Sequence, residues 1–329
     1  MKRREFITLV GGAAAAAWPL AARAQQAGKV WRIGLLSGAS RSAVSGLYDG
    51  FVQGMRELGY VNEKDYVIEW RSVEGGNYER VPEIAAEFVR LKVDVIVTAM
   101  GAALPTLQRA ITTIPIVMAT STDPVGNGLV SSLVRPGGNM TGLASSADDS
   151  SPKQLELLAT VVPNISRMGL LGNPSNTTYS PILKGAQDAA RNAGLSLMPI
   201  EARNLQETES AFAAFAKAGV QALIVSGDAV FFGQRWRVAE LALANRVATM
   251  FSQREYVVAG GLMSYGENLA DFFRRSASYV DKIFKGAKPG DLPIEQPTKF
   301  NLVINRKTAD ALGVTIPAQL YIFADEVID

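Results

Sequence analysis

The feature that most constrains the fold of this chain is an internal repeat. Two stretches show the same order of short apolar runs and amphipathic runs, and Arg167–Gly172 in the second nearly copies Arg32–Ser37 in the first. The order and spacing hold over roughly 85 residues in each copy. Short buried strands that alternate with amphipathic helices are typical of βαβ units in a parallel sheet. We therefore expect an α/β protein with two similar Rossmann-like lobes, each built on a parallel sheet.

The repeat also predicts the order of the elements, from apolar runs and from apolar residues at helical spacing. In the first copy the expected strands are 31–37, 66–70, 93–98 and 114–118, and the expected helices are 49–58, 81–91 and 104–111. In the second copy the expected strands are 167–172, 195–201, 222–226 and 248–251, and the expected helices are 182–192, 207–218 and 237–245.

The C-terminal part indicates how the two lobes are joined. Beyond the two complete copies it predicts a helix at 269–285, a strand at 300–304 and a helix at 306–312. The chain should therefore return to the first lobe and cross once more to the second. Three connections, near 139–145, 260–265 and 296–299, would form a hinge. The expected lobes are 29–142 plus 265–297 for lobe 1 and 143–264 plus 298–329 for lobe 2.

The first 24 residues have the layout of an export signal. Arg3-Arg4-Glu5-Phe6-Ile7 precedes an apolar stretch that runs to about Leu20, shorter than the roughly 20 strongly apolar residues of a spanning helix. Ala22 and Ala24 place small residues at a cleavage site, and the paired arginines favour the twin-arginine route. We expect cleavage after Ala24 and a free mature protein in the periplasm. A lipid anchor on cysteine is excluded because the chain has no cysteine.

The residue composition excludes several kinds of chemistry. The 329-residue chain has no histidine and no cysteine, which removes Ser-His-Asp and Cys-His catalysis, zinc sites built on those residues, and thiol chemistry. It has no GxGxxG or GxSxG motif, and Lys307-Thr308 lacks the glycines of a P-loop. Acidic residues are scattered without an obvious pair. We therefore expect no enzyme, no cofactor and no metal.

The charge of the chain argues against a nucleic acid partner. The formal net charge is +2, but the basic residues near the N-terminus account for the excess, so the rest of the chain is close to neutral. Phosphate binding needs clustered positive charge, and no run of Lys and Arg is present.

The best candidate binding surface is the set of loops that follow the strands. In open parallel α/β sheets ligands bind outside the carboxyl ends of the strands, and in two facing lobes those ends line one cleft. These loops are 37–40, 100–103, 120–123, 173–176, 226–228 and 252–253. The small or polar candidates within them are Ser37, Gly101, Ala102, Ser121, Asp123, Asn173, Asn176 and Asp228. Ser, Asn and Asp are also preferred helix N-caps, so a purely structural role is the alternative for these polar residues.

The same loops indicate the chemistry of the ligand. Those of the first lobe contain no Lys or Arg except Arg41, whereas a phosphate or dicarboxylate normally requires a fork of arginines. Backbone N–H groups near Gly101 and Ala102 could hold one carboxylate, and Asp123 or Asp228 an ammonium group. Three aromatic residues could stack on a flat ligand: Tyr48, Phe231 and Tyr265. We expect a small zwitterion or monocarboxylate, aromatic or branched rather than a sugar.

Several stretches along the mature chain also carry a family resemblance. They are 114–117, 123–125, 132–142, 153–158, 172–174, 260–266, 279–283 and 295–300. The most specific are Gly260-Gly261-Leu262-Met263-Ser264-Tyr265-Gly266 and Glu295-Gln296-Pro297-Thr298-Lys299-Phe300. Together they resemble the extracytoplasmic solute-binding proteins of ABC transporters, in particular the family that includes tryptophan- and tyrosine-binding members.

The resemblance implies a type I periplasmic-binding fold that closes on a solute and delivers it to the transmembrane subunits of an ABC permease. It implies ligand contacts from the loops after the strands, which selects the candidates above and adds Tyr265. Aromatic amino acids are the default ligand. The twin-arginine leader and the absence of cysteine depart from lipid-anchored members and affect localisation only.

Two other functions stay open at this point. A module of the same fold could sense a periplasmic ligand for a sensor or regulatory partner, and neighbouring permease and ATPase genes would argue against it. A carboxylate-based hydrolase or lyase is the second alternative, and turnover of a tightly bound compound would reveal it.

Replacing Arg3 and Arg4 together by lysine should trap the precursor in the cytoplasm, because the arginine pair is the feature that a twin-arginine receptor reads. Cell fractionation and N-terminal analysis of the exported protein check this. Normal processing of the double variant after Ala24 would assign export to the general secretory route.

Overall fold

The structure is a computed structural model that describes residues 29–74, 77–145, 147–176, 178–296 and 299–329. The predicted export signal and its cleavage site lie outside these residues. In the described part of the chain, no helix has the length and apolar character needed to cross a bilayer.

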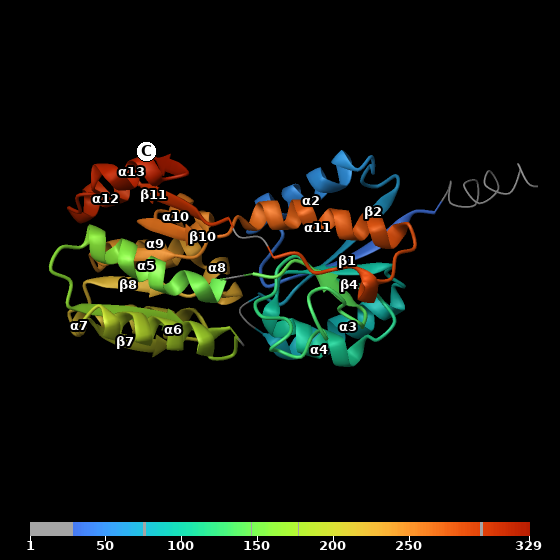
Figure 1. The fold of residues 1–329 in the computed structure, drawn as a ribbon, viewed down its shortest axis with the longest axis horizontal. Helices are drawn as coiled ribbons and strands as arrows, with labels where there is room; N and C mark the ends of the chain where they lie inside the picture. The colour runs from blue at the N-terminus through green and yellow to red at the C-terminus, as the bar shows by residue number, and fades with distance from the viewer. Residues whose placement is uncertain (1–28, 75–76, 146, 177, 297–298) are drawn as a thin grey trace, which may run out of the picture.

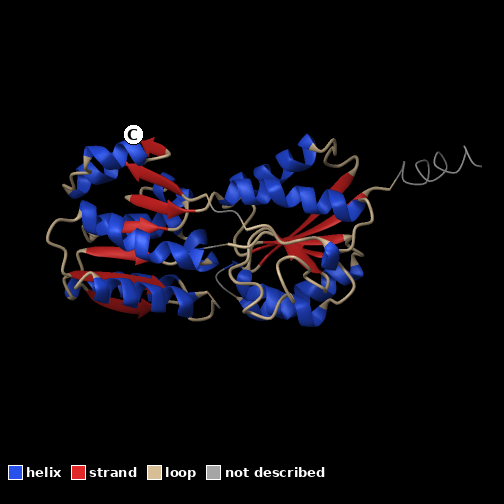
Figure 2. Cartoon of the chain, viewed as in Figure 1, coloured by secondary structure: helices blue, strands red, loops and turns tan. Residues whose placement is uncertain are grey.

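The chain forms two lobes, each with one sheet and helices packed against it (Figures 1 and 2). The sheet of the first lobe has the strand order β2-β1-β3-β4-β5 and is parallel throughout. Its strands are β1 (Trp31–Ser37), β2 (Tyr66–Ser72), β3 (Val95–Thr98), β4 (Ile116–Met118) and β5 (Met140–Gly142). Its helices are α2 (Ser45–Glu57), α3 (Val81–Arg90), α4 (Leu104–Ala110) and α11 (Leu269–Phe284), with short 3₁₀ turns η2 (Tyr78–Arg80), η3 (Gly101–Ala103) and η4 (Pro289–Asp291).

The sheet of the second lobe has the order β12-β11-β10-β9-β8-β6-β7. Its strands are β6 (Arg167–Gly172), β7 (Ser196–Glu201), β8 (Ala222–Val225), β9 (Ala248–Phe251), β10 (Met263–Gly266), β11 (Asn301–Asn305) and β12 (Glu326–Ile328). Its helices are α5 (Ala147–Val161), α6 (Tyr179–Asn192), α7 (Leu205–Lys217), α8 (Ala229–Gly233), α9 (Arg235–Ala244), α10 (Arg254–Val258), α12 (Arg306–Leu312) and α13 (Ala318–Phe323). The predicted class, two α/β lobes built on parallel sheets, is confirmed, with strands that are mostly parallel.

One pair of neighbouring strands is antiparallel, which the sequence analysis did not predict. β10 pairs antiparallel with β11, while β11 and β12 are parallel to each other. The reason is the route of the chain. β10 runs toward the first lobe, the chain then builds α11 there, and it re-enters the second sheet from the same side, so β11 must run in the opposite direction.

The three connections between the lobes lie close to the predicted places, with one correction. Leu143–Ser145 follows β5, and Leu143 forms an isolated bridge with Glu295 of the third connection. We expected the second connection at 260–265, but Met263–Gly266 is β10, which pairs with β9 and β11. The chain therefore crosses at Glu267-Asn268, and the expected start of the returning segment at residue 265 lies within β10.

Other elements escaped prediction because they are short or weakly patterned. They are β5, α5, α8, α10, β10, α13 and β12. α8 and α10 have only five residues each, too few for an apolar periodicity to show. α5 contains Pro152, a residue that normally argues against a helix interior.

The helix that returns to the first lobe is fixed there by close packing on α2, as Figure 1 shows for α2 and α11. Gly54 of α2 lies so near α11 that a Cβ atom at this position would come within 2.2 Å of the Arg274 carbonyl oxygen. At the far end of α11, Phe284 stacks on Trp31 with ring centroids 4.2 Å apart. Arg274 also pairs with Glu57 of α2 at 2.9 Å. The sequence-distant α11 is therefore an integral part of the first lobe.

Two glycines of α2 provide a matched test of this packing. Gly54→Ala should lower the free energy of unfolding by about 1–3 kcal/mol, because the new methyl group forces α2 and α11 apart. Gly46→Ala, on the same helix but with no atom within 4 Å of the added Cβ, should leave stability unchanged or raise it slightly. Urea unfolding measures both, and equal effects would contradict the backbone-to-backbone contact.

Candidate functional site

A cavity of about 190 Å³, measured over the positions open to the centre of a water molecule, lies where the two lobes meet. A single water needs about 10–15 Å³ on this measure, so the cavity has room for a compact organic molecule. It is lined by loops at the carboxyl ends of strands from both sheets, the place expected for a ligand in this architecture. The strand-end segments in the lining are 37–39, 99–102, 120–122, 226–229, 252–253 and 266–267.

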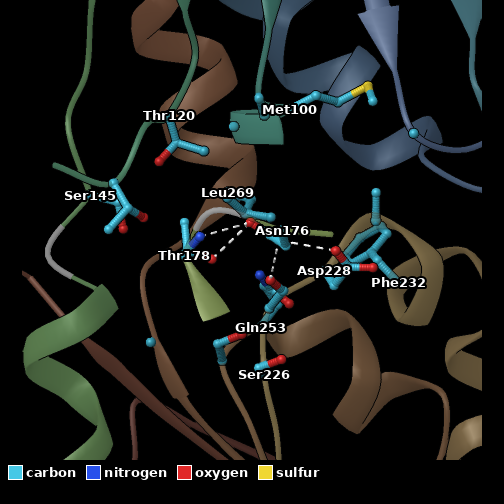
Figure 3. A pocket seen from close by; sticks show the side chains of 18 of the residues that line it. Met100, Thr120, Ser145, Asn176, Thr178, Ser226, Asp228, Phe232, Gln253 and Leu269 are labelled. Carbon is cyan, nitrogen blue, oxygen red and sulfur yellow. Dashed lines mark hydrogen bonds between the residues drawn. The ribbon is translucent and has the colours of Figure 1, made fainter. Parts of the chain in front are cut away.

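A buried carboxylate, Asp228, organises the second-lobe side of the cavity. Asn173 Nδ2 donates to Asp228 Oδ1 at 3.1 Å, and Asn176 Nδ2 donates to Oδ2 at 3.0 Å. The backbone N–H of Val230 donates to Oδ1 at 2.8 Å, so Asp228 is also the N-cap of α8. Figure 3 shows Asn176 between Asp228 and Thr178, whose N–H and hydroxyl both donate to Asn176 Oδ1. The two roles considered for these polar residues, helix cap and cavity lining, thus coexist.

The burial and the charge of Asp228 shift pKa values on both lobes. Burial raises the pKa of Asp228 above its ordinary value, and the hydrogen bonds from Asn173, Val230 and Asn176 oppose that rise. Tyr78, in η2 of the first lobe, also lines the cavity. Burial raises its pKa, and the nearby negative charge of Asp228 raises it further. The Asp228 carboxylate therefore acts on both lobes.

A second polar cluster joins two of the connections between the lobes. Ser145 of the first connection donates its hydroxyl to Glu267 Oε2 of the second at 2.5 Å. Both residues are buried, and both line the cavity. Gln154 of α5, another lining residue, donates through Nε2 to the carbonyl oxygen of Tyr265 at 2.8 Å. The hinge side of the cavity is therefore polar and cross-linked by hydrogen bonds.

The charged groups of the lining have one sign. Among the described residues around the cavity, Asp228 and Glu267 are acidic, and none is Lys or Arg. A multiply charged anion would find no cation to pair with here, and anion binding would rely on backbone N–H groups.

Three buried oxygen atoms of lining residues have no hydrogen-bond partner in the described part of the chain. They are Thr120 Oγ1 from the first lobe and Ser252 Oγ and Gln253 Oε1 from the second. Buried polar groups nearly always pair with protein, water or ligand. These atoms are the groups that a bound molecule or water would satisfy. Ser252 and Gln253 lie in a loop that the sequence analysis identified but did not single out.

The aromatic lining differs from the residues expected to stack on a ligand. Tyr78, Phe232, Phe273 and Phe300 line the cavity, whereas Tyr48, Phe231 and Tyr265 do not. Phe231 has no exposed surface and belongs to the apolar core. Tyr48 packs under the Arg41 guanidinium, 3.9 Å from the ring centroid. Tyr265 stacks behind Phe300, with centroids 5.5 Å apart.

The structure brings most of the predicted site residues together. Those that line the cavity are Ser37, Gly101, Ala102, Ser121, Asn176 and Asp228. Asn173 lies behind them and holds Asp228. Asp123 is exposed in a turn where its Oδ1 accepts from the Gly126 N–H at 2.8 Å, and it is not among the lining residues. The expectation that Asp123 faces the ligand is therefore not supported by its position. Within the described residues, no cluster of three or more acidic side chains could hold a metal ion.

Comparison with known proteins places this fold and cavity in context. The model of the family described as "ABC transporter substrate binding protein" matches residues 32–328. A tyrosine-binding protein of Clostridioides difficile is 24% identical over 265 residues, which is 80% of this chain and 76% of that protein. A Streptococcus pneumoniae structure in complex with L-Trp has 27% identity and a TM-score of 0.83, covering 91% of this chain and all of that one. A conserved domain protein of Vibrio cholerae has 26% identity, a TM-score of 0.81 and the same coverage.

Two helix N-caps test whether Asp228 does more than cap α8. Asn204→Ala removes an exposed cap of α7, whose side chain accepts from the Glu207 N–H, and should cost about 1 kcal/mol. Asp228→Ala should cost distinctly more, about 2–4 kcal/mol, because it also leaves the buried Asn173 amide without its acceptor and removes one of the two acceptors of the half-buried Asn176 amide. Thermal or urea unfolding gives both values, and similar costs would show that the network adds nothing to the cap.

Proposed function

The chain belongs to the ABC transporter substrate-binding protein family, and we propose that it is the extracytoplasmic solute-binding component of an ABC importer. It closes on a small amino-acid-like solute and delivers it to the transmembrane subunits of a membrane permease. The observation that carries the proposal is the cavity between the lobes, because loops from both sheets line it. A solute bound there touches both lobes at once, and closure about the three connections encloses it.

The lining supports an amino acid as the solute. Asp228 and Glu267 give the cavity a negative charge that suits an ammonium group, and no Lys or Arg is among its described residues. A carboxylate would be held by backbone N–H groups near Gly101 and Ala102, where η3 begins. Tyr78, Phe232, Phe273 and Phe300 offer aromatic surface to a flat side chain. The similarity to the tyrosine-binding and L-Trp-holding proteins makes L-tyrosine and L-tryptophan the first candidates.

The proposal includes a location. Substrate-binding proteins of ABC transporters work outside the cytoplasmic membrane. The arginine pair and apolar stretch at the N-terminus support export, with cleavage after Ala24 and release into the periplasm.

Calorimetric titration with L-tryptophan and L-tyrosine tests the proposed solute class. The wild-type protein should bind at least one of them with micromolar or tighter affinity, and it should ignore D-glucose and succinate. Tight binding of the neutral sugar or the dicarboxylate, with none of the amino acids, would overturn the solute class.

A pair of glycine variants ties the binding to this cavity. A side chain at Gly101 would meet no atom within 4 Å of its Cβ, and Gly101 lines the cavity, so Gly101→Leu fills it without a backbone clash. We expect affinity to fall by at least about tenfold, or 1.4 kcal/mol. Gly138→Leu, equally unhindered but exposed and away from the lining, is the matched control and should bind normally, as should Asp123→Ala. Unchanged affinity in Gly101→Leu would place binding elsewhere.

A further inference from the structure

Away from the three connections, the two lobes touch each other directly beside the cavity. Gly38, Ala39 and Tyr78 of the first lobe meet Asp228, Ala229 and Gly233 of the second. We propose that these six residues form a latch that holds the lobes closed in a measurable fraction of molecules even without solute. The proposal rests on the proposed function, since it concerns the closure that encloses a solute, and it assigns part of the closing free energy to the protein itself.

The first support is steric. A Cβ atom at Gly38 would lie 2.2 Å from the Cβ of Ala229, which no real pair of carbon atoms allows. Gly38 therefore makes the approach of α8 possible, and its backbone is not in the left-handed region that would by itself require glycine. A Cβ at Gly233 would lie 3.7 Å from the Cβ of Ala39, an ordinary contact distance. Small residues on both sides thus allow the loop after β1 to pack against α8.

The second support is the continuity of the apolar core across this contact. Ala39 and Val44 of the first lobe and Val230 and Phe231 of α8 belong to one cluster of buried apolar side chains. Each of them is less than a tenth exposed. Opening the lobes at this place would expose part of that surface to water, which opposes opening.

The third support is polar. Tyr78 and Asp228 line the cavity from opposite lobes, near enough for the Asp228 carboxylate to raise the pKa of the Tyr78 hydroxyl. Asn173 and Asn176 fix the Asp228 carboxylate as the acceptor. A hydroxyl beside a carboxylate can donate to it, and a hydrogen bond to a charged acceptor is stronger than one between neutral groups. Tyr78 is therefore a positioning residue for closure, and removing its hydroxyl should favour the open form.

Spin labels on the two lobes can measure closure directly. The chain has no cysteine, so Glu83→Cys in α3 and Gln206→Cys in α7 give two unique, exposed attachment points, one on each lobe. Electron–electron double resonance then reports the distance distribution without added solute and with L-tryptophan. In the otherwise wild-type protein a short-distance population should be present without solute.

Two variants and one control decide the proposal. Tyr78→Phe should shift the distribution toward the longer, open distances, because it removes the hydroxyl that lies beside the Asp228 carboxylate. Gly38→Val should abolish the short-distance population. Tyr60→Phe removes a hydroxyl that donates to Asp281 within the first lobe at 3.0 Å, and it should leave the distribution unchanged.

The outcomes separate this proposal from the proposed function. The latch is overturned if the solute-free protein shows no short-distance population, or if Tyr78→Phe behaves like Tyr60→Phe. Failure of the protein to bind any amino acid would overturn the proposed solute class instead, and the solute-free distributions would still decide the latch.

Discussion

The burial of the Asp228 carboxylate is the constraint on which much of the site depends. Moving a carboxylate out of water costs several kcal/mol unless donors surround it. Here Asn173, Asn176 and the first turn of α8 meet that requirement. To do so, the loop after β6 has to lie against the loop after β8, and α8 has to begin at residue 229. The position of α8 in turn brings Ala229 and Gly233 to the first lobe. One buried charge thus determines the shape of the second-lobe wall of the cavity.

The hinge side of the molecule shows how two rigid lobes can rotate while they stay aligned with each other. Leu143 and Glu295 bridge the first and third connections, and Ser145 and Glu267 join the first and second. The connections therefore behave as one cross-linked unit rather than three loose linkers. The backbone rotation that opens the lobes has to occur at the few residues where this unit joins each lobe, because the strands and helices on either side are tightly packed. This confines the motion largely to opening and closing of the cavity.

The parts of the structure that the sequence predicted are those with strong local patterns. Strands such as β3 and β8 consist of apolar residues that are fully buried, and helices such as α3 show apolar residues at regular helical spacing, so both were visible in the sequence. The loops of the cavity followed from one rule about parallel sheets. That rule places Ser121 and Asp123 at the same sheet edge but cannot say which one faces inward. The left-handed turn at Asp123, with φ of 38°, sends that side chain to a Gly126 N–H instead.

The sequence analysis did not identify the aromatic residues that line the cavity, for a related reason. Phe231 and Phe232 are neighbours on a helix of five residues, and a shift of one position on such a helix turns a side chain from the core to the cavity. Phe273 and Phe300 come from segments that reach the cavity only because the chain crosses between the lobes three times. No local pattern contains that information, since it depends on where α11 and β11 dock in the complete fold.

The contacts that hold the lobes closed can be only moderately strong if the protein is to bind a solute. A solute enters the open form, so the apparent dissociation constant rises as the fraction of molecules that can accept solute falls. If the closed form without solute outnumbered the open form a hundredfold, that correction alone would weaken binding by about 2.7 kcal/mol. A contact made mainly of small residues buries little apolar surface and should lie well below that limit. Gly38 has no side chain and that of Ala229 is a single methyl group, which keeps the contact close but small. The same small residues that permit the lobes to meet thus keep the closed form from dominating before a solute arrives.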